Sequence, residues 1–286
     1  MDVDAGRSRF VPVNGVNLHV KEFGPADGRP VLLLHGFPEF WWGWRKQLGP
    51  LAEAGFRVWA PDQRGYNLSD KPLGIAAYTQ DVLADDAAGL LQAMGGPAVL
   101  VGHDWGAAIA WRVAVRYPQL VSRLVAMDVP HPTVMDAALR HDPRQLLRSW
   151  YVFALQVPRL PERQLQADGF RRLVGQLRSG AKAGSFSEAE VEEYRRAWSQ
   201  PGALRAMLSW YRAAVRRRAA PFAAPRVTVP TLVMWGAADR YVLPYLAGRS
   251  AELCDHAQLE VVAGATHWLH HEESGLVNRR LLEFFG

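Results

Sequence analysis

The sequence predicts an α/β protein whose mostly parallel, eight-stranded sheet is flanked by helices. Three observations lead to this prediction. Short apolar runs alternate with helical patterns over the first 130 residues, as in parallel sheets, whose strands need crossover helices. About 90 residues without a convincing strand follow, which indicates a helical insertion. The strand–helix alternation then resumes near the C-terminus.

The first elements are a hairpin and a series of buried strands. Residues 9–24 contain Asn14-Gly15, a dipeptide that favours a tight hairpin turn. Continuous apolar runs then predict parallel strands buried on both faces, and spacing near 3.6 residues predicts helices. The expected strands are residues 31–36, 57–62, 98–104 and 123–129, and the expected helices are residues 42–54, 78–94 and 106–117.

The insertion follows the sixth strand. Its sequence is rich in Arg, Gln, Leu, Ala and Trp, with helical pieces bounded by prolines. Two further strands, residues 231–236 and 258–264, and a helix over residues 272–285 complete the pattern. Because open α/β sheets bind ligands at the carboxyl ends of their strands, helices inserted there would close over a site. The predicted domains are a core, residues 1–130 and 226–286, and a helical cap, residues 131–225.

The composition is that of an ordinary globular protein, and it disfavours nucleic-acid-binding, secreted and membrane-spanning proteins. The 286 residues carry a formal charge of +5 from arginines spread along the chain, so no nucleic-acid partner is predicted. The single Cys254 cannot form an internal disulfide, which suits the cytoplasm. We expect no secretory leader, because MDVDAGRSRF has no apolar h-region, and no membrane span, because no apolar run is long enough. We expect a small-molecule substrate, no membrane partner, and a monomer or homodimer.

The stretch VGHDWGA, residues 101–107, is the most informative motif. It places Asp104 between a buried strand and a helix, and Gly102 and Gly106 permit a sharp turn there. This pattern matches the G-x-S-x-G elbow that displays a nucleophile, with Asp in the place of Ser. The alternative interpretation is that Asp104 simply caps the helix.

Three further motifs follow other predicted strands. HGFP, residues 35–38, is expected to supply one oxyanion-hole N–H group, that of Phe37. Trp105, the residue directly after Asp104, is expected to supply the other. WGAAD supplies Asp239, and GATHW supplies His267. The chain order then is nucleophile, acid and base, as in α/β hydrolases. His270 and His271 are competing bases, although the distance from the strand favours His267. HWLHH lacks metal-ligand spacing, so we predict no metal and no cofactor.

Together, HGFPEFWWGWR, PDQRGYNLSDKP, GHDWGA, WGAADRYV and ATHWLHHEE resemble the epoxide hydrolase branch of the α/β-hydrolase fold. That branch is related to the haloalkane and fluoroacetate dehalogenases. The resemblance spans residues 10–285 and is weakest in the predicted cap. It implies the α/β-hydrolase fold with a cap, and an Asp nucleophile that opens epoxides to vicinal diols.

An aspartate nucleophile suits a saturated carbon electrophile. A serine would form an ether that water cannot cleave, whereas Asp104 would form an alkyl ester with a carbonyl. His267 could then activate water against that carbonyl, while the N–H groups of Phe37 and Trp105 stabilise the oxyanion. Asp239 would orient His267 and stabilise its imidazolium form.

The resemblance also implies two cap tyrosines that protonate the departing alkoxide. MLSWYRA resembles the second-tyrosine motif, so Tyr211 is the predicted donor. In RSWYVFALQVP, alignment places Ala154 where some members have the first tyrosine, and nearby Tyr151 is a possible substitute. Trp150, Trp105 and Phe37 are the predicted pocket residues.

Two alternatives remain open. In a dehalogenase, Trp150, Tyr151 and Tyr211 would align with halide-pocket residues, and Asp128 after the sixth strand would replace Asp239 as the acid. Fluoroacetate dehalogenases, however, carry arginines where this chain has Trp105 and Ala108, and haloalkane dehalogenases typically have Asn where it has Phe37. A non-catalytic binding protein on the same scaffold is the second alternative, but the complete catalytic set disfavours it.

Overall fold

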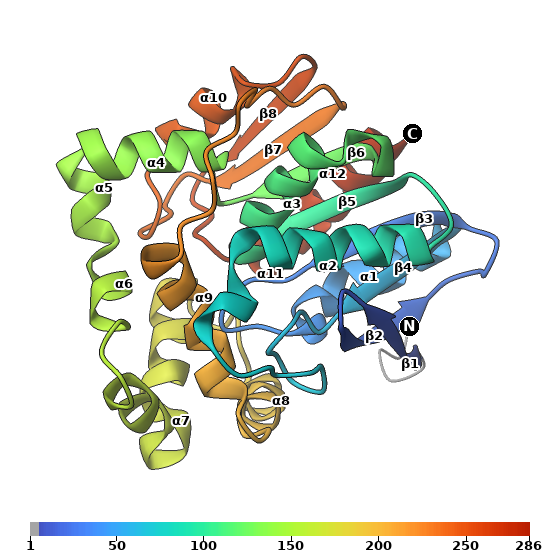
Figure 1. Cartoon of the computed structure of the whole chain (residues 1–286). Helices are drawn as coiled ribbons and strands as arrows, with labels where there is room; N and C mark the ends of the chain where they lie inside the picture. The colour runs from blue at the N-terminus through green and yellow to red at the C-terminus, as the bar shows by residue number, and fades with distance from the viewer. Residues whose placement is uncertain (1–5) are drawn as a thin grey trace.

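The structure is a computed structural model that describes residues 6–286, and its main feature is one sheet (Figure 1). The eight strands lie in the order β1-β2-β4-β3-β5-β6-β7-β8. Pairs within β1-β2-β4 are antiparallel and all the others are parallel. The predicted mostly parallel, eight-stranded sheet is therefore confirmed. The strands are β1 (Arg7–Val13), β2 (Val16–Phe23), β3 (Arg29–Leu34), β4 (Phe56–Pro61), β5 (Ala98–His103), β6 (Val121–Met127), β7 (Thr231–Gly236) and β8 (Ala257–Val262).

The hairpin turn forms where the sequence predicts it. Val13 pairs with Val16 across the turn. Asn14 and Gly15 both have positive φ, at 45° and 75°, as the mirror-image turns of hairpins require. The turn is also tied to the sheet's outer layer, since the Asn14 side chain donates to Asp86 at 2.9 Å.

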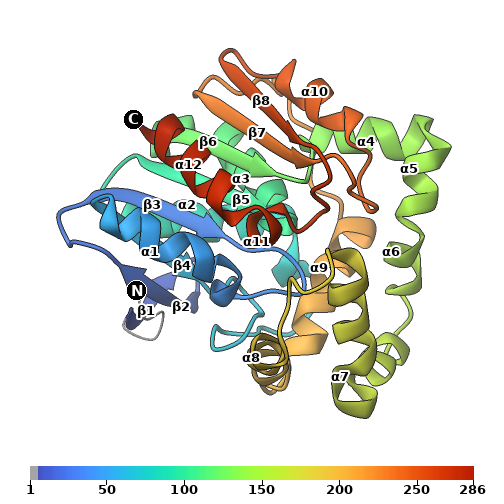
Figure 2. The ribbon, with the colours of Figure 1, turned by 180° about the vertical axis from the view of Figure 1, so that it is seen from behind.

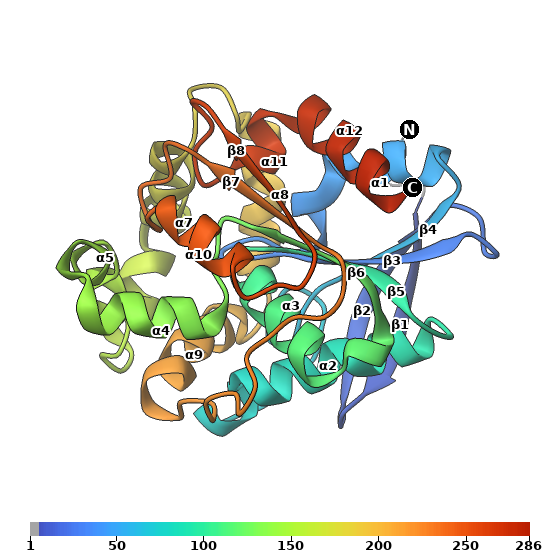
Figure 3. The same cartoon turned by 90° about the horizontal axis from the view of Figure 1, so that it is seen from above.

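Helices cover both faces of the sheet because its central strands are apolar on both sides. Helices α2 and α3 lie on one face, and α1, α11 and α12 lie on the other (Figures 2 and 3). The core-forming helices are η2 (Trp41–Trp44), α1 (Arg45–Glu53), η3 (Ile75–Tyr78), α2 (Gln80–Ala93), α3 (Trp105–Arg116), η4 (Pro118–Leu120), α10 (Tyr245–Ala251), α11 (Leu269–Glu272) and α12 (Ser274–Phe285).

Six helices separate β6 from β7, where the sequence predicts an insertion (Figure 1). They are α4 (Pro132–His141), α5 (Pro143–Arg148), α6 (Trp150–Ala154), α7 (Leu160–Gly180), α8 (Glu188–Trp198) and α9 (Ala203–Arg216). Helix α7 is kinked at residues 167–170, where the backbone leaves the helical region. The division into a core domain and a cap domain stays a prediction.

Element boundaries differ slightly from the sequence-based expectations. Each predicted parallel strand lies within two residues of the observed one at either end. The predicted helix over residues 78–94 begins at Gln80, because Thr79 is extended and its side chain accepts from the Val82 N–H. The predicted last helix, residues 272–285, begins two residues later at Ser274, since Glu273 has non-helical torsions. Within residues 6–286, no helix combines the length and apolar character that a transmembrane span requires.

Candidate active site

Asp104 lies on a strained turn between β5 and α3. Its φ of 50° and ψ of −121° are unusual for a residue with a side chain. The carboxylate forms no capping hydrogen bond with α3, which argues against the helix-cap interpretation. The turn also needs Gly36, because a Cβ there would lie 2.5 Å from the Asp104 Oδ1. The local backbone therefore presents this carboxylate instead of using it to hold the helix.

The surroundings of Asp104 favour its ionised form. The Phe37 N–H donates to Oδ1 at 2.7 Å, and His267 Nε2 lies 3.4 Å from Oδ2. Burial opposes ionisation, but His267 and the Phe37 N–H outweigh it and lower the pKa of Asp104. Trp105 begins α3, and the first N–H groups of a helix have no partner inside it.

His267 bridges Asp104 and a second carboxylate. Its Nδ1 lies 2.8 Å from the Asp239 Oδ2, and both side chains are buried. Burial disfavours the imidazolium form, but the Asp239 and Asp104 carboxylates outweigh it and raise the pKa of His267 well above its ordinary value. Asp239 is itself held by the N–H groups of Tyr241 and Val242, which donate to Oδ1 at 2.7 and 3.0 Å. The structure thus brings together the predicted nucleophile, base and acid.

Asp128, the alternative acid, lies beside Asp239 and His267, but it forms no hydrogen bond with the His267 imidazole. Its Oδ1 accepts from the Gly236 N–H at 2.8 Å, and its buried Oδ2 has no partner within residues 6–286. Burial and then the neighbouring Asp239 carboxylate raise the pKa of Asp128 well above its ordinary value. Burial and the Asp239 charge therefore favour the neutral form of Asp128, whereas an acid that orients an imidazolium needs a charge.

We expect Asp239→Asn to lower kcat by about 10³- to 10⁴-fold, because the amide would hold His267 in the wrong tautomer. We expect Asp128→Asn to lower kcat by less than about tenfold, since an amide closely mimics the neutral acid. Steady-state turnover of both variants with one epoxide makes the comparison. The reverse ranking would transfer the orienting role to Asp128.

Aromatic side chains from the insertion and from the rest of the chain meet beside Asp104, the predicted nucleophile. Tyr211 of α9 is buried, and its ring centroid lies 5.2 Å from that of Phe37 and 5.1 Å from that of Trp105. The Tyr151 ring of α6 lies 6.1 Å from the Tyr211 ring. Burial, with Asp104 contributing, raises the pKa of both tyrosines. Both phenols are therefore protonated at neutral pH and able to donate.

The structure separates three other predicted or aligned positions from this group. The Trp150 side chain is 64% exposed, so we leave it out of the proposed pocket. Ala154 is exposed, whereas the Tyr151 ring lies beside the Tyr211 ring. Ala108 is buried inside α3 and offers no charge for a carboxylate substrate.

Sequence reasoning missed three residues that hold the acid loop. The Tyr241 ring packs against the His267 imidazole at 5.2 Å. In α5, Gln145 accepts from the Leu243 N–H and donates to the Tyr241 carbonyl, and Arg148 donates to the Asp239 carbonyl at 2.8 Å. The only signal for Tyr241 was its place two residues after Asp239, and α5 gave none.

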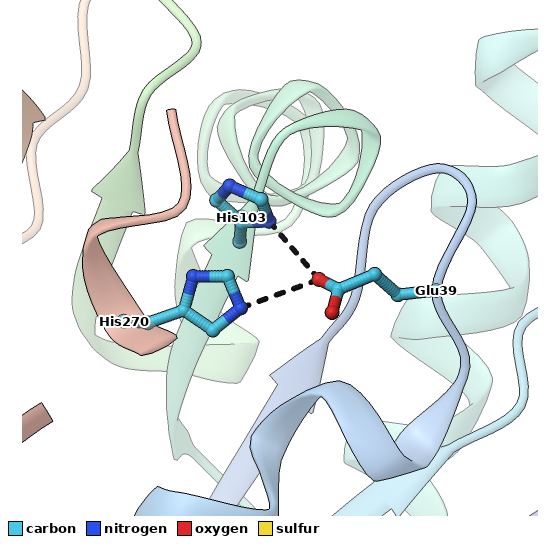
Figure 4. A group of neighbouring side chains, drawn as sticks. All are labelled: Glu39, His103 and His270. Atoms are coloured by element: carbon cyan, nitrogen blue, oxygen red, sulfur yellow. Dashed lines mark hydrogen bonds and ion pairs between the residues drawn. The ribbon is translucent and has the colours of Figure 1, made fainter. Parts of the chain in front are cut away.

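A second buried group, centred on Glu39, lies behind the nucleophile. The imidazoles of His103 and His270 point at its carboxylate (Figure 4), with nitrogen–oxygen distances of 3.4 and 3.2 Å. Tyr194 of α8 donates to the other oxygen at 2.7 Å, and His271 Nε2 lies 2.7 Å from it. Burial opposes ionisation, but the histidines outweigh it and lower the pKa of Glu39 well below its ordinary value.

The Glu39 group is joined to the candidate active site through hydrogen bonds that hold the main chain next to Asp104 and at His267. His103 directly precedes Asp104, and its Nε2 donates to the carbonyl of His267 at 2.7 Å. His270 and His271 contact Glu39, which argues against either as the base. Glu39, His103 and His270 offer three metal-ligand atoms within 4.8 Å of one another. Burial is the largest factor that lowers the pKa of His270 and His271, and the hydrogen bonds between their imidazoles and the Glu39 carboxylate account for this arrangement.

Comparison with known proteins places this geometry in a family. A family model described as "alpha/beta hydrolase fold" matches residues 29–274. The chain belongs to the α/β-hydrolase family. Within that family it is 42% identical to the AB hydrolase superfamily protein YfhM of Bacillus subtilis, over 99% of each chain. It is 33% identical to Epoxide hydrolase 2 of Caenorhabditis elegans, covering 96% of this chain and 79% of that protein.

Solved structures agree with this family assignment. An epoxide hydrolase of Bacillus megaterium, in complex with an inhibitor, superposes on this α/β hydrolase with a TM-score of 0.90. The two share 32% identity over 97% of this chain and 99% of that chain. The α/β-hydrolase fold and the resemblance to its epoxide hydrolase branch are therefore confirmed. What this α/β hydrolase acts on is a separate question.

Proposed function

We propose that this hydrolase opens epoxides to vicinal diols through an ester formed on Asp104. The observation that carries the proposal is the pairing of a carboxylate, on a nucleophile elbow, with the buried His267–Asp239 pair. A carboxylate in that place suits attack on a saturated carbon, because the resulting ester can be hydrolysed. The epoxide hydrolases among its relatives support this choice of electrophile.

In the first step, an Asp104 oxygen attacks an epoxide carbon and the carbon–oxygen bond of the ring breaks. The electron pair of that bond goes to the ring oxygen, which takes a proton from Tyr211 or Tyr151. Their raised pKa values keep both phenols protonated, and an alkoxide is basic enough to accept the proton. The product of this step is a hydroxyalkyl ester of Asp104.

In the second step, water attacks the carbonyl carbon of that ester. Ester formation has removed the Asp104 charge, one of the two that raise the pKa of His267, and this favours the neutral imidazole that the step needs. His267 accepts a proton from the water, and the Asp239 carboxylate stabilises the imidazolium that forms. The N–H groups of Phe37 and Trp105 are proposed to hold the oxyanion; the Phe37 N–H already donates to Oδ1 at 2.7 Å. The tetrahedral intermediate then collapses: its carbon–oxygen bond to the diol breaks, and the departing oxygen takes the proton from the His267 imidazolium. The carboxylic acid left at Asp104 loses its proton, which balances the proton that the tyrosine gave up in the first step, so the cycle needs no cofactor.

We expect Tyr211→Phe to lower the rate of ester formation by about 10²-fold or more, because general-acid catalysis contributes about that much. Tyr151→Phe should have a similar or smaller effect, since Tyr211 remains. Single-turnover mixing separates this step from ester hydrolysis, which should be unchanged. A loss confined to hydrolysis would contradict the donor role of the tyrosines.

The leaving group decides between the proposal and a dehalogenase. We expect styrene oxide to give diol, while fluoroacetate, chloroacetate and 1-bromobutane give no halide on the same enzyme sample. Trp105 and the buried Ala108 leave no arginine clamp for a haloacid. Halide release without diol would overturn the proposal and move attention to Asp128. Absence of both products, with the chain folded, would favour the non-catalytic alternative.

A further inference from the structure

The outer side of the insertion exposes apolar side chains that the proposed chemistry does not use. Figure 1 shows α5, α6 and the start of α7 along this side, remote from β1 and β2. Twelve large apolar residues are exposed within residues 6–286, and six of them lie in this short stretch. We call the six the apolar stripe: Leu146, Leu147, Trp150, Phe153, Val157 and Leu160.

The same part of the chain holds its excess of positive charge. Arginines are spread along the whole sequence, but acidic residues that could pair with them are scarce in this stretch. Residues 143–180 have seven arginines and only two acidic residues, so their formal charge of +5 equals that of the whole chain. Arg144 and Arg178 form ion pairs, and Arg148 donates to the carbonyl of Asp239. The other four pair with no acidic side chain within residues 6–286: Arg159, Arg163, Arg171 and Arg172.

Three of these unpaired arginines surround one hollow. Arg163, Arg171 and Arg172, with Gln164, Ala167 and Asp168, line a surface cavity of about 550 Å³ at the kink of α7. All three arginines are exposed. Guanidinium groups bind phosphate oxygens in two-pronged geometry. The hollow begins one helical turn beyond Leu160, the last residue of the apolar stripe.

We infer that this side of the insertion is a docking surface for an anionic lipid bilayer. The apolar stripe would enter the interface between headgroups and acyl chains, where Trp is favoured. The unpaired arginines would bind the phosphates of anionic headgroups. The negative surface potential of an anionic bilayer would also attract these arginines. Both halves of the surface match one occupant, whereas a second copy of this basic stretch would be repelled. The sequence led us to expect no membrane partner because it lacks a spanning segment, but docking on a bilayer surface does not require one.

The docking surface lies directly behind the proposed proton donors. Helix α6 carries Tyr151 as well as the exposed Trp150 and Phe153. The following segment is tied to α9, because Gln156 donates to the carbonyl of Tyr211 at 3.1 Å. Lipid contact would therefore favour lipophilic substrates dissolved in the bilayer, a consequence that rests on the proposed function. The docking itself does not depend on it.

Flotation with vesicles tests the proposal on the full chain. We expect the protein to float with vesicles of equal parts phosphatidylcholine and phosphatidylglycerol, but not with phosphatidylcholine alone. Raised salt should weaken this binding, because it screens exposed charges. Arg171→Gln with Arg172→Gln should weaken binding at least about tenfold, since each basic residue contributes about 1 kcal/mol near such a membrane. Phe153→Ser should weaken it through loss of apolar contact.

Matched controls lie on the opposite side of the molecule. Phe10 of β1 is 58% exposed, close to the 54% of Phe153, so Phe10→Ser controls for the loss of an exposed phenylalanine. Arg279 of α12 is exposed, so Arg279→Gln controls for the loss of charge. Neither control should change binding, and all variants should keep turnover of a small water-soluble substrate.

Three outcomes would overturn the proposal. The first is no flotation with anionic vesicles, and the second is equal flotation with both vesicle types. The third is an oligomer in solution that Phe153→Ser dissociates, which would assign the surface to a second copy. Loss of catalysis in every assay, with flotation intact, would count against the proposed function and leave the docking surface standing.

Discussion

Replacing Asp104 by Ala should lower turnover by at least about 10⁴-fold, because no other group in the site can form the ester. Asp104→Asn should have the same effect, since a neutral amide is a poor nucleophile of nearly the same shape. The measurement is diol formation from an epoxide at saturating substrate. The folded state should persist, because the carboxylate forms no capping bond with α3.

The matched control is Asp85→Ala, which removes a partly exposed carboxylate of α2 that is paired with Arg116. It should leave turnover within about twofold, since surface ion pairs contribute little. Thermal unfolding of all three variants separates loss of chemistry from loss of fold. Turnover near the normal rate in folded Asp104→Ala would refute the nucleophile assignment and, with it, the two-step scheme.

His267→Gln should trap the ester instead of preventing its formation. Attack by Asp104 on the epoxide needs no base, whereas hydrolysis of the ester needs an activated water. We expect hydrolysis to slow by about 10³-fold or more. Intact mass after one addition of substrate should rise by the mass of one epoxide molecule, because ester formation keeps every atom of both partners.

The control for this variant is His141→Gln, which changes an exposed histidine at the end of α4. It should show normal turnover and no persistent adduct. Digestion of trapped His267→Gln should place the added mass on the peptide containing Asp104. A folded His267→Gln enzyme with slow turnover and no adduct would argue for direct attack of water on the epoxide.

The sequence predicted the sheet and the proximity of Asp104, Asp239 and His267 for a shared reason. Buried parallel strands appear as continuous apolar runs, so their ends could be located within two residues. Asp104, Asp239 and His267 each follow such a strand, and the carboxyl ends of parallel strands meet at one edge. Their proximity therefore followed from topology, without any knowledge of side-chain positions.

What the sequence could not predict depends on contacts across long separations or on the face of a helix. Glu39 meets His270 across 231 positions, and no local pattern indicates that pairing. Trp150 and Tyr151 are adjacent aromatic residues, yet one is 64% exposed and the other faces Tyr211. The orientation of α6 decides between them, and helices as short as five residues have too little periodicity to fix it.

The hydrogen bonds between α5 and the loop after β7 bear on which segments of this hydrolase could be exchanged with those of its relatives. Gln145 and Arg148 belong to the inserted stretch by chain position, yet they hold the main chain around Asp239 and Tyr241. A chimera that exchanged everything between β6 and β7 would leave the catalytic loop with a foreign support. A crossover point after Ser149 would retain these native contacts, so the range of substrates could be varied without loosening the proposed acid, Asp239.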